Sequence, residues 1–283
     1  MKPYPHQEVF ASKMWDILKV KGYAYLAGKP RSGKTYTSIL CAEKSTKISS
    51  VLVLTKKAAI PGWMKFIDGN STLNHKYTVV NYEQAHKLNA TDYQLVIIDE
   101  SHNLGGTGKP SKRYQTIRKL CWNMPRIHLS GTAIVESQCS IYYQMTLSKY
   151  SPFSHKNFYR FHDQYGEKYY IKAAGRDIPQ YDRAKDILLP LINTFTVYMT
   201  QEDAGIDKSV QAVDKVHYVE LDEATKELYN SLQKDLIIEL EDDFGNTATI
   251  VCDTVMRLRV VLHQIESGIF KIGANDAVSY NMD

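Results

Sequence analysis

The sequence predicts an α/β fold with a mainly parallel sheet, followed by a short helical segment at the carboxyl-terminal end. Short apolar runs alternate with helical stretches over residues 1–200, and a glycine-rich loop joins the first such pair. Several of these runs contain no polar residue, as is typical of parallel strands that helices cover on both faces. With 283 residues, of which 43% are hydrophobic, the chain is long enough for one large domain or two small ones.

Each candidate strand is a short run rich in apolar and β-branched residues. The candidate strands are Tyr23–Ala27, Val51–Leu54, Thr78–Val80, Leu95–Ile98, Ile127–Leu129 and Phe195–Tyr198. The candidate helices between them are Glu8–Val20, Lys34–Ser45, Lys112–Cys121 and Cys139–Thr146. We therefore expect these elements to build a first domain over residues 1–210.

Residues 150–190 interrupt the alternation because they are crowded with aromatic side chains. We expect a helical excursion whose rings pack onto the sheet; the alternative is that some rings stack on the bases of a single strand. Residues 211–283 then begin a second unit. It should contain a strand over Lys215–Leu221 and two helices, over residues 222–242 and 254–270, with a turn at Gly245 and Asn246 between them.

Composition and targeting signals restrict the class of protein. The 35 Lys and Arg residues exceed the 31 Asp and Glu residues, and this net charge of +4 permits a nucleic-acid partner without demanding one. The amino terminus has no apolar signal region, and no run approaches the ~20 apolar residues that span a bilayer. We expect a protein without a membrane partner, located in the cytoplasm, at the nucleoid or, if viral, in the host cytoplasm. Isolated cysteines indicate reduced, mostly buried thiols: Cys41, Cys121, Cys139 and Cys252.

A phosphate-binding loop follows the first candidate strand and runs into a candidate helix. Its residues fit the pattern GxxxxGK[ST] and are Gly28, Lys29, Pro30, Arg31, Ser32, Gly33, Lys34 and Thr35. Glycines let backbone N–H groups face an anion, and the helix N-terminus adds partial positive charge. Lys34 should reach the outer phosphates of a nucleotide, and the Thr35 hydroxyl should hold Mg²⁺.

Two adjacent carboxylates, Asp99 and Glu100, end the apolar candidate strand Leu95–Ile98. A first carboxylate in this position can reach Mg²⁺ beside the phosphates, while a second can orient or deprotonate the attacking water. Alone, the pair could equally open a solvated turn. Together with the phosphate loop it predicts nucleoside triphosphate hydrolysis, with catalytic residues Lys34, Asp99 and Glu100.

The residues around these motifs resemble superfamily 2 helicases and translocases, in particular the Swi/Snf-like branch of DNA translocases. Asp99-Glu100-Ser101-His102 resembles motif II, and Ser130-Gly131-Thr132-Ala133 resembles motif III. Pro5-His6-Gln7 lies where the family has its adenine-reading glutamine, Ile60–Trp63 resembles the end of motif Ia, and Val80–Glu83 resembles a Tyr-Glu segment. The similarity extends more loosely through Ser111–Arg113, Asn193–Gly205, Val216–Leu232 and Leu258–Gly268.

The resemblance implies a RecA-like fold, ATP and Mg²⁺ as cofactors, duplex DNA as the main partner, and single-stranded DNA or RNA as further candidates. It implies that Gln7 reads adenine and that His102 couples the nucleotide site to motif III, whose Ser130, Gly131 and Thr132 are the other coupling residues. His102 could instead be a packed core histidine. The residues implied in DNA contact are Thr55, Lys56, Lys57, Tyr82, Lys109, Lys112 and Arg113. Each of these lysines could instead be an ordinary solvated surface charge.

The sequence departs from the family at three points. Ala133 replaces the usual proline of motif III, and Tyr198-Met199 replaces an arginine pair. Only a short segment follows Gly268, so we expect the second RecA-like lobe to be supplied by a longer chain or another protein, and ATP hydrolysis by this chain alone to be weak. Two other functions remain open: a phosphate-loop ATPase outside the helicases, such as a DNA-packaging motor or a small-molecule kinase, and a non-catalytic, ATP-dependent DNA clamp.

Overall fold

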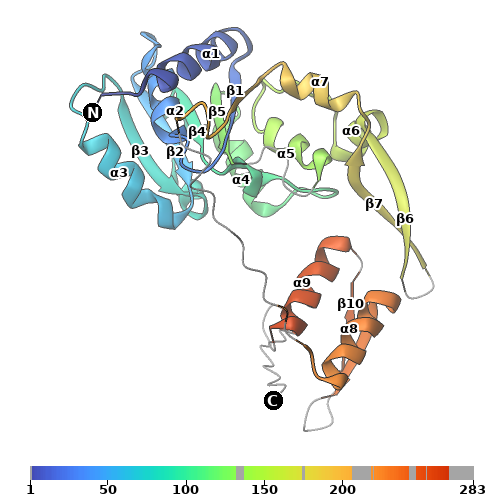
Figure 1. The fold of residues 1–283 in the computed structure, drawn as a ribbon. Helices are drawn as coiled ribbons and strands as arrows, with labels where there is room; N and C mark the ends of the chain where they lie inside the picture. Colours follow the sequence, from blue (N-terminus) through green and yellow to red (C-terminus); the bar gives the residue numbers. More distant parts are fainter. Residues whose placement is uncertain are drawn as a thin grey trace. The chain divides into compact units, whose positions relative to one another are not determined.

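The chain divides into two compact units in the computed structural model (Figure 1). The structure describes residues 2–131, 137–173, 176–205, 218, 220–241, 247–252 and 254–267. The first unit comprises residues 1–167 and 181–211, and the second comprises residues 168–180 and 212–283.

A six-stranded parallel sheet forms the centre of the first unit, in the order β3-β2-β4-β5-β1-β8. Its strands are β1 (Tyr23–Gly28), β2 (Ser50–Thr55), β3 (Lys76–Asn81), β4 (Leu95–Ile98), β5 (Arg126–Ser130) and β8 (Thr196–Met199). All six match the candidate strands, so the predicted α/β class is confirmed. Because every strand runs in the same direction, the segments that follow the strands meet at one edge of the sheet, which we call the carboxyl edge.

Helices cover both faces of this sheet (Figure 1). They are α1 (Pro5–Lys21), α2 (Lys34–Glu43), α3 (Ile60–Asp68), α4 (Lys112–Cys121) and α5 (Ile141–Met145). Alternate strand residues enter two different cores: Leu26 and Val53 pack in the cluster that includes α1, α2 and α3 residues, whereas Tyr25 and Leu54 pack in the cluster with α4 and α5 residues. This alternation follows from the two-residue period of a strand.

The aromatic segment is only partly helical, which corrects the expectation for residues 150–190. It contains α6 (Phe158–Tyr165), the hairpin strands β6 (Gly166–Ala173) and β7 (Arg176–Ala184), and α7 (Leu188–Asn193). Tyr169, Tyr170 and Ile171 favour a strand, and Pro179 has no N–H for a helix interior. The rings of Phe153, Phe158 and Phe161 are buried in the α4–α5 core, which agrees with the packing role, whereas Tyr159 and Tyr170 are exposed.

The second unit also contains strands where helix was expected. Besides the parts of β6 and β7 in residues 168–180, its described elements are α8 (Glu223–Asp235), the antiparallel strands β9 (Ile237–Glu241) and β10 (Thr247–Val251), and α9 (Val255–Glu266). The helix expected over residues 222–242 stops early because Leu236 takes a left-handed conformation, with φ of 60°, and caps α8. The β-branched residues that follow pair instead as a hairpin. Most of Lys215–Leu221, Gly245, Asn246 and residues 268–270 lie outside the described residues.

The four cysteines are free and buried, as the sequence predicts. Among the described residues, no helix combines the length and the apolar character needed to cross a bilayer.

The turn between α1 and β1 gives a test of packing. Gly22 has φ of 72°, its N–H donates to the Leu18 carbonyl at 2.8 Å, and a Cβ atom there would lie 2.4 Å from Cδ1 of Tyr150. We predict that Gly22→Ala lowers the free energy of unfolding by about 1–3 kcal/mol in urea denaturation. Gly62→Ala in α3 is the matched control, because a Cβ atom at Gly62 would have no neighbouring atom within 4 Å. This substitution should raise the free energy of unfolding by up to about 1 kcal/mol. Equal urea midpoints for Gly22→Ala and wild type would contradict this packing.

Candidate nucleotide-binding site

The glycine-rich loop joins β1 to α2, as predicted. Gly33 caps α2 with φ of 89°. The Lys34 ammonium donates hydrogen bonds to the backbone carbonyls of Gly28 at 2.8 Å and of Lys29 at 3.2 Å, so the side chain folds back over the loop. A phosphate oxygen could replace these carbonyls as the hydrogen-bond acceptor of the Lys34 ammonium.

The remaining loop residues are tied to neighbouring segments. Ser32 is buried, and its hydroxyl donates to the Lys29 carbonyl at 2.7 Å. The Pro30 carbonyl accepts a bond from the Gln201 amide at 3.3 Å. Arg31 is exposed and adopts a left-handed conformation with φ of 66°. Local hydrogen bonds therefore support the conformation of the loop.

Gln7 reaches this loop from the first turn of α1. It is buried; its Oε1 accepts from the Tyr4 N–H at 3.0 Å, and its Nε2 lies 3.5 Å from the Gly33 carbonyl. A Cβ atom on Gly33 would lie 2.3 Å from Nε2 of Gln7, so only glycine permits this approach. The structure thus brings Gln7 to the loop, while its adenine-reading role stays a prediction.

Asp99 follows β4 at the carboxyl edge and is almost completely buried. Its Oδ2 accepts hydrogen bonds from the Thr55 hydroxyl at 2.8 Å and from the Trp63 indole N–H at 2.9 Å. The Tyr82 hydroxyl donates to the Asp99 backbone carbonyl. Within the described residues, the side-chain donors all reach Oδ2, which leaves Oδ1 for a metal ion or its bound water.

Glu100 adopts a left-handed backbone conformation with φ of 51°. This conformation costs a non-glycine residue of the order of 1–2 kcal/mol, and such strain is concentrated at functional sites. The Glu100 carboxylate lies 3.3 Å from Nδ1 of His102, and the same nitrogen lies 2.9 Å from the Ser130 hydroxyl. His102 therefore connects the end of β4 to the end of β5 and is not a packed core histidine.

Ser130 and Gly131, the described residues of motif III, lie between the loop and the acids, because β5 pairs with both β1 and β4. A Cβ atom on Gly131 would lie 3.9 Å from the Gly28 carbonyl, so this turn approaches the phosphate loop directly. Thr132 and Ala133 lie outside the described residues.

A buried hydroxyl network supports this edge, and sequence reasoning did not find it. The Gln144 Oε1 in α5 accepts bonds from the Tyr25 hydroxyl at 2.8 Å and from the Ser101 hydroxyl at 3.1 Å. The Ser101 hydroxyl oxygen also lies 2.9 Å from the Tyr25 hydroxyl oxygen, so its single proton can point to either acceptor. The position of Ser101 directly after the two acids could have indicated that it belongs to this site. Nothing in the local sequence marks Gln144.

The electrostatics link Lys34 with the acids. Burial lowers the pKa of Lys34, whereas the carboxylates of Glu100 and Asp99 act to raise it. The lysine and both carboxylates therefore lie within electrostatic range of one another. The residues present fit a nucleotide with its metal ion: backbone and lysine donors for phosphate, a carboxylate oxygen and a threonine for Mg²⁺, and a second carboxylate beside them.

The residues predicted to contact DNA fall into two groups. Five are exposed at segments that follow the strands, and we call them the basic edge: Lys56, Lys57, Lys109, Lys112 and Arg113. Thr55 and Tyr82 are instead buried beneath this surface and bond to Asp99. Their side chains are turned toward the acidic end of β4, away from solvent.

Comparison with known proteins gives the family. Residues 35–267 match the family of the SNF2-related domain, which is well over half of the chain. The chain belongs to the SNF2-related domain family. The expected resemblance to the Swi/Snf-like branch is confirmed, and a phosphate-loop ATPase of another family is set aside. The match begins at Thr35, so the assignment of Gln7 and of residues 28–34 depends on their sequence and geometry.

Solved structures of SNF2 proteins share the fold. The Sulfolobus solfataricus SWI2/SNF2 ATPase core in complex with dsDNA aligns with a TM-score of 0.55 and 18% identity, over 83% of this chain and 54% of that one. The Sulfolobus solfataricus SWI2/SNF2 ATPase core domain aligns with a TM-score of 0.51 and 17% identity, over 83% of this chain and 53% of that one. The SNF2-related chain thus spans about half the length of the structures it matches. No curated protein sequence gave a significant match.

The bond between Thr55 and Asp99 can be tested directly. We predict that Thr55→Val, which keeps the shape and removes the hydroxyl, lowers the free energy of unfolding by about 1–3 kcal/mol, because the buried carboxylate loses a donor. Urea denaturation without nucleotide measures this change. If Thr55→Val leaves the free energy of unfolding unchanged but weakens binding to duplex DNA, Thr55 contacts DNA as the sequence predicts and does not stabilise Asp99.

Proposed function

We propose that this chain is the ATP-binding and ATP-hydrolysing lobe of a motor that moves along duplex DNA. The observation that carries the proposal is the meeting of Lys34, Asp99 and Glu100 at the carboxyl edge, with His102 and Ser130 beside them. Nucleotide chemistry requires a cation for phosphate and carboxylates for metal and water in one place.

Each residue of the site has a separate task in this proposal. Lys34 binds the outer phosphates, and Thr35 and Asp99 hold Mg²⁺, which neutralises phosphate charge when it is bound. Glu100 accepts a hydrogen bond or proton from the attacking water. His102 orients the Glu100 carboxylate, since its Nδ1 lies 3.3 Å from that group.

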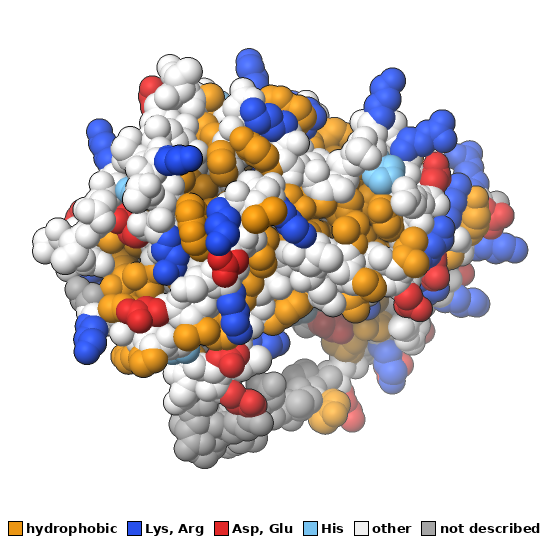
Figure 2. All heavy atoms as spheres, turned by 90° about the horizontal axis from the view of Figure 1, so that it is seen from above, with side chains coloured by type: hydrophobic (Ala, Val, Ile, Leu, Met, Phe, Trp, Pro, Cys, Tyr) orange, Lys and Arg blue, Asp and Glu red, His pale blue; other side chains and the backbone are white. Residues whose placement is uncertain are grey.

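The basic edge is the proposed surface for the DNA backbone. Lys112 and Arg113 occupy the first turn of α4, whose N-terminus already carries partial positive charge, and this turn contains no acidic residue. Such an arrangement is unfavourable for an isolated helix and favourable when a phosphate is bound. Figure 2 shows one face of the protein, on which Lys and Arg side chains lie among hydrophobic and acidic ones.

Tyr82 is a physical connection between the basic edge and the nucleotide site. The Arg113 guanidinium lies 5.9 Å from the centre of the Tyr82 ring and pairs with Glu83 at 2.9 Å. The Tyr82 hydroxyl donates to the Asp99 carbonyl. A DNA phosphate could replace Glu83 as the partner of Arg113. This would change the surroundings of Tyr82, which bonds to Asp99, so DNA binding would affect the nucleotide site.

The partner and the activity of the full protein are part of the proposal. One of the similar solved structures is a SWI2/SNF2 ATPase core in complex with dsDNA. This similarity supports duplex DNA, rather than single-stranded DNA or RNA, as the partner. A second RecA-like lobe, in a longer chain or in another protein, would close over the nucleotide.

We predict that Lys34→Ala abolishes nucleotide binding, whereas Glu100→Gln still binds ATP and lowers its turnover by about 100-fold or more. The lysine meets the phosphates in the ground state, and the glutamate acts on water. A fluorescent ATP analogue followed by anisotropy measures binding, and single-turnover hydrolysis with excess protein and duplex DNA measures chemistry.

Glu167→Gln is the matched control, because Glu167 is exposed and distant in sequence from the motifs. Normal turnover by Glu100→Gln would remove Glu100 from its proposed role. Affinity for duplex DNA that depends on ATP, without any turnover by wild type, would identify the non-catalytic clamp.

For the basic edge, we predict that replacing Lys112 and Arg113 with alanine weakens duplex binding and leaves ATP affinity unchanged. The slope of log affinity against log salt should flatten by about one to two units, since each phosphate contact contributes roughly 0.9. Anisotropy of a labelled duplex in a series of salt concentrations measures the slope.

The control is the double variant Lys44→Ala and Lys47→Ala. Both lysines are exposed and precede β2, at the opposite edge of the sheet. If the two double variants have equal salt slopes, Lys112 and Arg113 do not contact DNA phosphates and are ordinary solvated charges.

A further inference from the structure

A recess separate from the nucleotide site lies in the first unit, between α4, α5 and residues 148–158. Its volume is about 540 Å³, within the range of sites for small ligands. The basic side chains in its lining are Arg118, Lys149, His155 and Lys156, and the lining contains no Asp or Glu. We call this the α4 recess. None of the residues assigned to ATP or DNA lines it.

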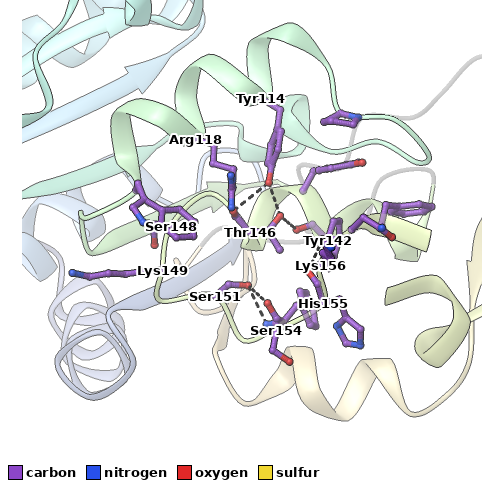
Figure 3. Close-up of a pocket in the computed structure, with 16 residues that line it drawn as sticks. Tyr114, Arg118, Tyr142, Thr146, Ser148, Lys149, Ser151, Ser154, His155 and Lys156 are labelled. Atoms are coloured by element: carbon purple, nitrogen blue, oxygen red, sulfur yellow. Dashed lines mark hydrogen bonds between the residues drawn. The ribbon is translucent and has the colours of Figure 1, made fainter. Parts of the chain in front are cut away.

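One wall of the recess is a single face of α4. Tyr114, Arg118 and Trp122 are spaced four residues apart and therefore project from the same side of the helix. At 1.5 Å per residue they extend over about 12 Å. Figure 3 shows Tyr114 and Arg118 pointing from α4 toward Thr146, with Ser151 and Ser154 on the facing segment. The length corresponds to about four residues of an extended peptide.

The floor of the recess consists of aromatic rings with few free polar groups. Burial raises the pKa of Tyr142 to about 12, so its phenol is neutral at physiological pH. The phenol groups of the lining are bonded within the protein: Tyr142 to the His155 carbonyl at 3.0 Å, Tyr143 to the Gly108 carbonyl, and Tyr114 to the Thr146 hydroxyl at 2.8 Å. This surface suits an apolar side chain. A nucleobase would find few partners for its polar edge.

The rim carries positive charge that the protein does not neutralise. The Arg118 guanidinium lies 4.4 Å from the centre of the Trp122 ring, and its Nε donates to the Thr146 carbonyl at 3.1 Å, so it is fixed in place. Among the described residues, no carboxylate forms an ion pair with Arg118, Lys149 or Lys156. A cationic rim around an apolar floor is complementary to a ligand that is both acidic and apolar.

We propose that the α4 recess binds a short acidic peptide segment of a partner protein. An aromatic or aliphatic side chain of the segment packs on Tyr142 and its neighbouring rings. Flanking carboxylates meet Arg118, Lys149 and Lys156. The site is independent of the proposed nucleotide chemistry, and Lys34→Ala should bind the peptide as wild type does.

The test uses the full chain and a fluorescein-labelled peptide in which glutamates surround one central phenylalanine. Anisotropy should give saturable binding that weakens with salt. The double variant Lys149→Gln and Lys156→Gln should weaken binding about five- to tenfold, as the loss of two partly exposed ion pairs predicts. Replacing the central phenylalanine of the peptide with alanine should weaken it at least about tenfold, because a buried ring is lost.

Lys119→Gln is the matched control, since Lys119 is exposed on α4 and lies outside the recess. It should leave the peptide affinity unchanged, and the circular dichroism spectra of all variants should agree. Three results would overturn the proposal: no binding at millimolar peptide, equal binding of the alanine peptide, or equal losses for Lys119→Gln and the double variant. Displacement of the peptide by an equally charged oligothymidylate at the same concentration would also overturn it, in favour of a nucleic-acid site.

Discussion

At the carboxyl end of β4, the buried residue Asp99 is bonded to three other segments. Thr55 ends β2, Trp63 belongs to α3, and Tyr82 follows β3; the first two donate to the carboxylate and the third to the backbone carbonyl. A buried carboxylate is costly unless it is hydrogen-bonded, so the donors Thr55 and Trp63 stabilise the fold. The nucleotide side and the segments next to the basic edge therefore share one residue, Asp99.

The short helix α5 stands between two sites. Gln144 faces the sheet and accepts the hydroxyls of Tyr25 and Ser101, directly behind the acids. The adjacent Tyr142 and Tyr143 line the α4 recess instead. A helix of this length has little stability of its own, so its position depends on contacts on both sides.

A buried arginine holds the segment after α5 to the sheet. Arg126 begins β5 and is fully buried, and burial lowers its pKa to about 10, so it stays charged at neutral pH. Its Nε donates to Nε2 of His128 at 2.9 Å, and its other nitrogens donate to Ser148 and to a backbone carbonyl of α5. These bonds replace the carboxylate partner that a buried arginine usually requires, and they position the residues that line the recess.

The sequence by itself determined the α/β class, the six strands, the phosphate loop and the acid pair, because apolar periodicity and glycine-lysine spacing act over a few residues. It misassigned the two hairpins, where local helix signals competed with the pairing of β6 with β7 and of β9 with β10. It named Thr55 and Tyr82 as DNA contacts but could not tell that their side chains are buried, since a motif fixes the order of residues and not the direction of a side chain. Only the tertiary structure decided that these two hold Asp99, that Gln144 supports the acids from a distant helix, and that unpaired cations surround an aromatic floor. Those features depend on contacts between residues far apart in the chain, and no local pattern encodes such contacts.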